Sequence, residues 1–289
     1  MTRWRSNDSA GRSTRQEFNT MQVIGLCRFS YPAIGGFQVD FETLEEKLAY
    51  LYAPARMEER FATFETITLP PLRAQTDPDF TFVVVIGDSL PDMYRDRLEA
   101  LLSDMPQADL QVHAPAQHRP VMKKIINSVR RNTDAPCLQF RMDDDDAVAM
   151  DYVERLRGVA TDVRTLAARN ELLGIDFNRG YIIRPRAKGI EAAATSAPFQ
   201  TAALAMMVHP KSRQTIMNFA HFRLPNMMAC VTLTEPVMLL RGHNDFNDSR
   251  QGPSVKPQKL AMMDAAGEAE LADRFNIDAD AVRAAFSRL

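Results

Sequence analysis

The feature that most constrains the fold is a continuous apolar run at residues 82–86, which has polar residues on both sides of it. A strand with no polar residue on either face is typical of a parallel strand that is buried on both sides. Three further strand-like segments, at residues 23–27, 110–113 and 138–142, alternate with segments in which apolar residues recur at helical spacing. Strand and helix therefore alternate four times, and this pattern predicts a doubly wound parallel sheet in an α/β fold.

Charged residues stand at the end of three of these predicted strands. Arg28 follows the first strand, Asp88 follows the valine-rich strand, and Asp143 follows the strand at 138–142. Sheets of this class bind ligands beyond the carboxyl ends of their strands, so we expect the three residues to meet at one site. The loop after Arg28 has no GxGxxG pattern and no Walker A lysine, and neither dinucleotide nor P-loop binding is expected.

Four consecutive aspartates, residues 143–146, follow the last of these strands. In an extended chain, Asp143 and Asp145 would project to one side and Asp144 and Asp146 to the other. Two aligned carboxylates suit a hard divalent cation, which takes oxygen ligands and completes its shell with water and substrate phosphates. A solvated acidic turn that caps the following helix is the alternative interpretation.

Composition excludes several classes of protein. The 289 residues include 45% hydrophobic residues and carry a net charge of −2, so no basic excess points to a nucleic-acid partner. Three scattered cysteines form no metal or redox motif and suit a reducing cytosol. No apolar run approaches the roughly 18 residues that a transmembrane helix needs. Residues 1–20 are polar, which predicts a disordered tail and not a secretory signal.

In the second half of the chain, strand-like and helix-like patterns of apolar residues no longer alternate regularly. We expect the following elements: a helix around residues 148–159, paired strands at 172–177 and 180–183, a loop at 185–200, a strand at 202–209, a helix at 211–222 and a last strand at 236–241. Two helices close the chain, and Asp278 caps the second of them.

The order of the motifs resembles that of the GT-A glycosyltransferases, and of family 2 enzymes in particular. The residues that carry this resemblance are the passage at 72–80, the strand that ends in Asp88 and Ser89, and the strand that ends in the four aspartates. Over about residues 20–255 the chain is more closely similar to the rhamnosyltransferase family of bacteria, through residues 28–32, 140–146 and 243–250.

The resemblance implies a GT-A-like doubly wound mixed sheet flanked by helices, with C-terminal helices. It implies a glycosyltransferase domain at 21–255, with a nucleotide-binding half at 21–150, an acceptor half at 151–255 and a helical extension at 256–289. The implied reaction is metal-dependent transfer of rhamnose or another deoxyhexose from a nucleotide-diphosphate sugar, such as dTDP-rhamnose, to a glycan or lipid-linked glycan. The implied location is the cytoplasm, with peripheral contact at the inner face of the membrane.

The resemblance also implies roles for particular residues. Asp143, Asp145 and His243 would hold Mg²⁺ or Mn²⁺. The nucleotide would contact Arg28, Phe29, Ser30, Asp88, Asp143 and Asp144. Lys123 is a further candidate, because lysine can serve as a point charge for phosphate, although a solvated helix face is the alternative for it. The remaining histidines, His113, His118, His209 and His221, are expected to have structural roles.

The general base and the reaction class remain open at this level. Glu235 and Asp245 are the candidate bases, with Asp248 as a further choice, since an inverting enzyme needs a carboxylate near the acceptor hydroxyl. Pro236 after Glu235 departs from the Glu-Asp pair of related enzymes. A nucleotidyl- or phosphotransferase and an inactive nucleotide-sugar-binding module are the alternatives. An EF-hand is excluded, because Val148 stands where its loop requires glycine.

Overall fold

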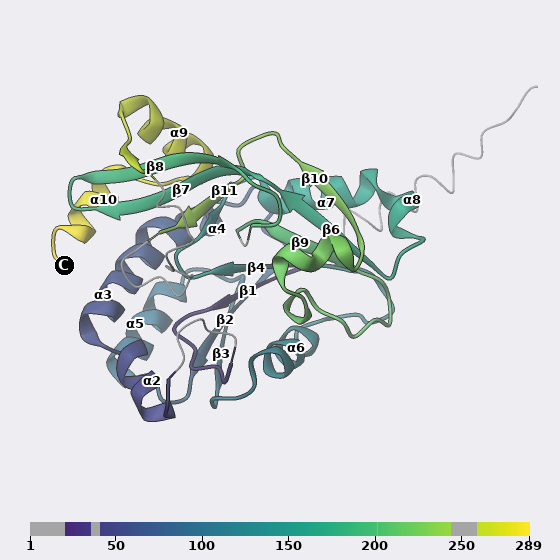
Figure 1. Cartoon of the computed structure of the whole chain (residues 1–289), viewed down its shortest axis with the longest axis horizontal. Helices are drawn as coiled ribbons and strands as arrows, with labels where there is room; N and C mark the ends of the chain where they lie inside the picture. Colours follow the sequence, from purple (N-terminus) through teal and green to yellow (C-terminus); the bar gives the residue numbers. More distant parts are fainter. Residues whose placement is uncertain (1–20, 36–40, 201, 244–258) are drawn as a thin grey trace, which may run out of the picture.

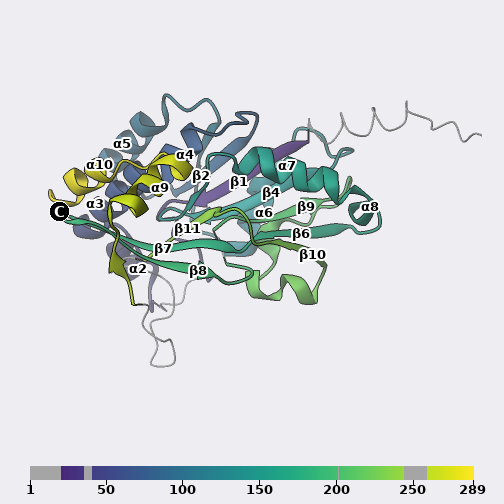
Figure 2. The same cartoon turned by 90° about the horizontal axis from the view of Figure 1, so that it is seen from above.

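The computed structural model describes residues 21–35, 41–200, 202–243 and 259–289. A seven-stranded sheet forms its centre, with the strand order β10-β6-β9-β4-β1-β2-β3 (Figures 1 and 2). These strands are β1 (Gln22–Arg28), β2 (Thr81–Gly87), β3 (Ala108–His113), β4 (Cys137–Asp143), β6 (Leu172–Phe177), β9 (Leu204–Val208) and β10 (Ala229–Leu233). The predicted tail at residues 1–20 lies outside the described residues.

The four predicted strands of the first half are confirmed as neighbours in this sheet. β1 pairs in parallel with β2 on one side and with β4 on the other, and β2 pairs in parallel with β3. The register places Arg28 directly opposite Asp143. β9 is antiparallel to both β4 and β6, so the sheet is mixed as predicted. The carboxyl ends of β1, β2 and β4 therefore lie at one edge.

β1, β2 and β4 are buried on both sides, because helices cover both faces of the sheet. One face packs against α3 (Pro54–Thr63), α5 (Asp92–Leu102) and α7 (Tyr152–Asp162) through Phe61, Leu98 and Leu156. The other packs against α6 (His118–Ser128) and two 3₁₀ turns, η2 (Ile216–Asn218) and η3 (His221–Asn226), through Ile125, Met217 and Leu224.

Two helical features correspond to local signals in the sequence. α2 (Leu44–Leu51) begins with a capping box, in which Thr43 and Glu46 bond to each other's backbone. Pro54 occupies the first position of α3, where its missing N–H costs no intrahelical hydrogen bond. α3 then continues without interruption through a π-helical turn, η1 (Phe64–Thr68), into α4 (Leu69–Arg73). This helical run reaches the acidic segment, as described below.

A second, five-stranded sheet has the order β12-β8-β7-β11-β5. Its strands are β5 (Ala147–Val148), β7 (Arg179–Arg186), β8 (Gly189–Ser196), β11 (Leu239–Gly242) and β12 (Ala261–Met262). The prediction that 172–177 pairs with 180–183 was wrong. β6 is already paired with β9 and β10, so neither of its edges is open, and β7 pairs with β8 and β11 in the other sheet.

Two further predictions were wrong. The segment at 185–200 is not a loop, because half of it forms β8, which pairs with β7 over its whole length. The segment at 211–222 is not an α-helix but contains the 3₁₀ turns η2 and η3, and Pro225 lies inside the second. Within the segment, the backbone N–H groups of Thr215 and Ile216 donate to the side chains of Asn218 and Gln139, and side-chain bonds of this kind compete with helical ones.

The C-terminal helices are confirmed as α9 (Ala265–Phe275) and α10 (Ala279–Phe286). The side chain of Asp278 accepts hydrogen bonds from the backbone of Asp280 and Ala281, so it caps α10 as predicted. α10 packs against α3, β7 and β8, and Figure 1 shows both helices beside the β7–β8 pair. These helices therefore support the second sheet and, through it, β11.

Candidate active site

The four aspartates form a turn at the end of β4 and do not continue the strand. The backbone N–H of Asp146 donates to the carbonyl of Asp143 at 3.2 Å. The Asp146 carboxylate accepts from the N–H of Asp143 at 3.2 Å and from the N–H of Gly242 at 3.1 Å. The predicted alternation of the four side chains was therefore wrong, because β4 ends at Asp143. Asp146 ties this turn to the end of β11.

Asp144 and Asp145 are buried against Arg60, which comes from α3. Each aspartate is 4% exposed. The Arg60 guanidinium donates to Asp144 and lies 3.4 Å from the Asp145 carboxylate. Thr68, in the π-helical turn, donates to the carbonyl of Asp144 at 3.0 Å. π-helical turns often occur at functional sites. This one carries Thr68, whose hydroxyl bonds to the acidic turn.

The carboxylates of the turn differ in their protonation. Burial raises the pKa of Asp145 to about 6, with Arg60 opposing the change and Asp144 and Asp143 adding to it. Burial together with Asp145 and Asp143 raises the pKa of Asp146 well above its usual range. Burial acts in the same direction on Asp143, but the facing Arg28 outweighs it and lowers the pKa of Asp143. Of Asp143, Asp145 and Asp146, Asp143 is therefore the one that is held most firmly in its charged form.

Asp143 and Arg28 meet at the edge of the sheet, as predicted. The Arg28 guanidinium donates to the Asp143 carboxylate at 2.9 Å, and the two side chains are 24% and 42% exposed. Arg28 also bonds to the Nε2 atom of His118, at the start of α6, at 3.1 Å. Because arginine can only donate, this Nε2 atom accepts, and the imidazole is neutral. Arg28 is thus held between a carboxylate and an uncharged ring and keeps part of its surface open.

We predict that His118 makes the protein less stable in mild acid. Burial and the neighbouring Arg28 lower its pKa from 6.5 to about 3. The unfolded chain binds a proton below pH 6.5 and the folded chain does not, so stability present above pH 6.5 is lost as the pH falls. Urea unfolding of the wild type should show a loss of about 1–2 kcal/mol between pH 7 and pH 5 relative to His118→Gln. Equal losses in both proteins would contradict the assignment of a neutral His118.

Arg141 is a site residue that the sequence analysis did not identify. It lies two positions before Asp143 on β4, so both side chains point to the face of the sheet that α6 covers. Arg141 donates to the carbonyl of Phe219 at 3.3 Å. Burial lowers the pKa of Arg141 to about 10, so it stays charged at neutral pH. The alternation along β4 was the signal that could have placed Arg141 beside Asp143.

The other predicted nucleotide contacts differ in their exposure and in their bonding partners. Asp88 follows β2 directly and is exposed, and Lys123 is half-buried on α6. The Phe29 side chain is fully buried beside Phe61 and Phe64, which leaves only its main chain available to a ligand. The Ser30 hydroxyl accepts from the buried Arg56 at 2.9 Å. Nucleotide binding by these residues stays a prediction.

Glu235, a predicted base, lies away from the acidic turn, whereas His243, the third predicted metal ligand, lies near it. Glu235 lies two residues beyond β10, forms an ion pair with Arg179, and is 70% exposed. His243 follows β11, and its backbone N–H donates to the carbonyl of Ile183 at 2.8 Å. The residue before it, Gly242, packs closely on the acidic turn: a Cβ atom added to Gly242 would lie 2.7 Å from the side chain of Asp145. β11 therefore brings His243 to the acidic turn. Asp245 and Asp248 lie outside the described residues.

The described residues do not form a ready metal site. No group of three or more His, Cys, Asp or Glu side chains among them is arranged to hold a metal ion. Asp145 faces Arg60, Asp146 accepts two backbone N–H groups, and Asp143 faces Arg28. The predicted set of Asp143, Asp145 and His243 therefore does not fit a cation in this conformation, and the positive charge at the turn comes from arginine.

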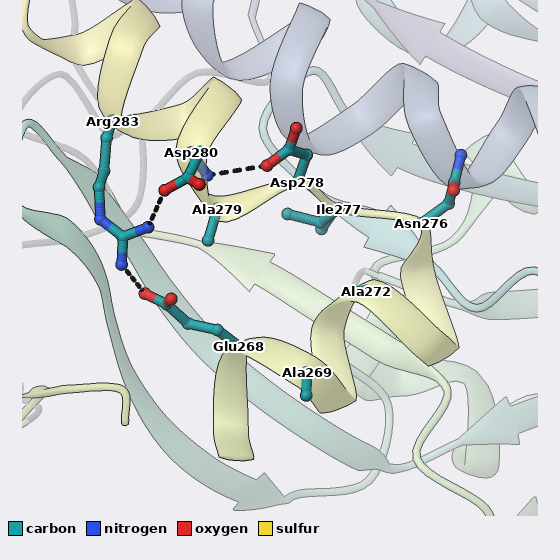
Figure 3. Close-up of a pocket in the computed structure, with 9 residues that line it drawn as sticks. All are labelled: Glu268, Ala269, Ala272, Asn276, Ile277, Asp278, Ala279, Asp280 and Arg283. Carbon is teal, nitrogen blue, oxygen red and sulfur yellow. Dashed lines mark hydrogen bonds and ion pairs between the residues drawn. The ribbon is translucent and has the colours of Figure 1, made fainter. Parts of the chain in front are cut away.

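A surface pocket between α9 and α10 is separate from this edge. Figure 3 shows Arg283 of α10 between Glu268 and Asp280, and it donates to Asp280 at 2.7 Å. No predicted site residue lines this pocket. Its ion pairs join the two C-terminal helices, which is a structural role. In the part of the chain that the structure describes, no helix has both the length and the apolar character to cross a membrane.

Comparisons with known proteins place the sequence in a family. Residues 22–256 match the family model described as "Putative rhamnosyl transferase". No curated protein matches significantly. Among solved structures, S. aureus TarS 1–349 is 10% identical with a TM-score of 0.41, over 77% of this chain and 60% of that one. The complex of TarS 1–349 with UDP-GlcNAc is 10% identical with a TM-score of 0.42, over 78% of this chain and 59% of that one. This chain thus spans less than two thirds of those structures, and TM-scores this low add nothing to the assignment.

Proposed function

The chain belongs to the putative rhamnosyl transferase family, and we propose that it transfers a sugar from a nucleotide-diphosphate sugar to a glycan acceptor at the edge formed by Arg28 and Asp143. The matched residues include β1, β2 and β4, which supply Arg28, Asp88 and Asp143. The observation that supports this site is the contact between Arg28 and Asp143 across the carboxyl ends of adjacent parallel strands. Ligands of such sheets bind at this edge.

The arginines supply charge where the reaction needs it. When the bond between the anomeric carbon and the phosphate oxygen breaks, its electron pair leaves with the nucleoside diphosphate. Positive groups that are already in place stabilise this developing charge. Arg28 is partly open, and a guanidinium binds phosphate oxygens through paired donors. Arg141 adds a second positive charge, which is half-buried on the same face. Asp143 would orient Arg28 and accept a donor hydroxyl.

The identities of the donor and the acceptor and the requirement for a metal are further proposals. The family description favours rhamnose as the sugar, which dTDP-rhamnose would supply. A glycan or lipid-linked glycan at the inner face of the membrane is the proposed acceptor. Dependence on Mg²⁺ or Mn²⁺ also stays a prediction, and no catalytic step here passes through a metal. Turnover measured with EDTA and with added Mn²⁺ tests it.

We predict that Arg28→Ala lowers kcat/KM about 10²-fold, because removing one preorganised donor to a developing anion costs on this order. Asp143→Asn should have a similar effect, since Arg28 loses its orienting partner. The measurement is nucleoside diphosphate released from a panel of dTDP-, UDP- and GDP-sugars with a glycan acceptor. Asp96→Asn is the matched control, because Asp96 is exposed on α5.

Two results would count against the proposal. If no donor in the panel releases nucleoside diphosphate, with or without Mn²⁺, the chain is not a nucleotide-sugar transferase. If Arg28→Ala and Asp143→Asn keep wild-type kcat/KM with an active donor, the site lies elsewhere. Binding of nucleoside diphosphate without turnover would favour the inactive binding module.

A further inference from the structure

His221, the first residue of η3, is held in one tautomer. Its Nδ1 atom lies 2.7 Å from the backbone carbonyl of Phe199. A carbonyl oxygen can only accept, so Nδ1 carries the hydrogen. In the neutral ring, Nε2 then has a free lone pair. Nε2 has no hydrogen-bond partner in the described part of the chain, so it can accept a proton from a ligand.

A buried aspartate holds the carbonyl that fixes this ring. Asp176, at 1% exposure, accepts from the N–H of Phe199 at 3.0 Å and from the Thr232 hydroxyl at 3.3 Å. Phe199 has a φ of 57°, a conformation that bulky residues rarely adopt. Strained backbone of this kind persists where the surroundings enforce it, and it occurs often at functional sites. The chain from Asp176 through Phe199 therefore orients His221.

The same ring lies at the candidate active site. Arg141 donates to the carbonyl of Phe219, two residues before His221, and so ties the chain just before η3 to the end of β4. The charged groups that act on His221 are Arg141 and Asp143 of β4 and Arg241 of β11. Burial and the two arginines lower the pKa of His221, so the ring is neutral at physiological pH. A neutral imidazole that interacts electrostatically with Arg141 and Asp143 has the properties of a general base.

We propose that His221 is the general base of the glycosyl transfer. Its Nε2 atom takes the proton of the acceptor hydroxyl while the hydroxyl oxygen bonds to the anomeric carbon. The bond from that carbon to the donor phosphate breaks, and its electron pair leaves with the nucleoside diphosphate. This inference rests on the proposed function.

The other described candidates fit this role less well. Glu235 is 70% exposed and paired with Arg179. Asp176 is buried, and both of its carboxylate oxygens already accept hydrogen bonds. Asp176 is therefore a positioning residue for His221.

The decisive variant is His221→Gln, because a glutamine amide can still donate to the Phe199 carbonyl but has no basic nitrogen. We expect kcat to fall about 10²–10⁴-fold, the usual contribution of a general base. The KM for the donor and the affinity for nucleoside diphosphate should change less than about threefold, because the base does not bind the donor. His209→Ala is the matched control, since His209 is exposed and follows the antiparallel β9 at the opposite edge of the sheet.

Two further measurements separate a base from a structural residue. The kcat of the wild type should fall in acid with a slope of one as His221 takes a proton, and this limb should be absent in His221→Gln. Added imidazole should restore part of the turnover of His221→Ala. If the alanine variant does not fold, the glutamine variant alone decides the matter.

The outcomes distinguish this inference from the proposed function. An active wild type with His221→Gln within tenfold of its kcat would overturn the role of His221 and leave the transferase intact. A wild type that releases no nucleoside diphosphate from any donor would instead overturn the proposed function.

Discussion

Replacing Arg60 by methionine is expected to lower the free energy of unfolding by about 3–5 kcal/mol. Arg60 is 4% exposed and faces Asp144 and Asp145, which are equally buried. Removing it takes the guanidinium away from two carboxylates that are out of water, and loss of the charge partner of a buried carboxylate is among the costliest defects in a folded protein. Methionine keeps the length of the side chain and removes only the charge and the donors. Urea unfolding at pH 8 with EDTA measures the effect.

A matched surface variant and a double variant test this explanation. Arg155→Met removes an exposed ion pair with Asp151 and should cost less than about 1 kcal/mol. Adding Asp144→Asn to Arg60→Met should restore part of the lost stability, because one of the stranded charges is removed. A loss of under 1 kcal/mol for Arg60→Met would mean that Arg60 does not neutralise the acidic turn.

The contact between Arg28 and Asp143 could be predicted from the sequence because it depends on local rules. Apolar runs in the sequence predicted the strands β1 and β4. Charged residues at the carboxyl ends of neighbouring parallel strands must then meet at one edge of the sheet. The same rules failed for β6 and β7, since Phe177 and Arg179 are separated by one residue but belong to different sheets. Pairing depends on which edges other strands leave open, and a local pattern does not contain that information.

Arg60 and His221 escaped prediction because their partners are distant in the sequence. Arg60 bonds to a residue 84 positions away, and His221 depends on Phe199, which Asp176 holds. One signal for Arg60 was available. It lies between Met57 and Phe64 at helical spacing, inside the stripe that packs on the sheet, where a charged residue needs a buried partner. His221 had no such signal, since its tautomer is set by a backbone carbonyl.

Gly242→Ala is expected to disable the site by separating the two sheets where they meet. A Cβ atom at Gly242 would lie 2.4 Å from the carbonyl oxygen of Asp145 and 2.7 Å from its side-chain carbons. The Gly242 N–H also donates to Asp146, so a shift of β11 would weaken the bond that holds the acidic turn. Overpacking of this kind typically costs about 1–3 kcal/mol in unfolding free energy.

The loss of turnover for Gly242→Ala should be larger than the loss of stability suggests. A displacement of about 1 Å in a catalytic group can cost 10²-fold in rate, and the turn carries Asp143, which orients Arg28. Gly158→Ala is the matched control: Gly158 lies in α7 with nothing within 4 Å of the added Cβ atom. That substitution should stabilise the helix by about 0.5–1 kcal/mol and leave turnover unchanged. Wild-type stability and turnover in Gly242→Ala would show that β11 does not pack on the acidic turn, and the site would then have to form without the second sheet.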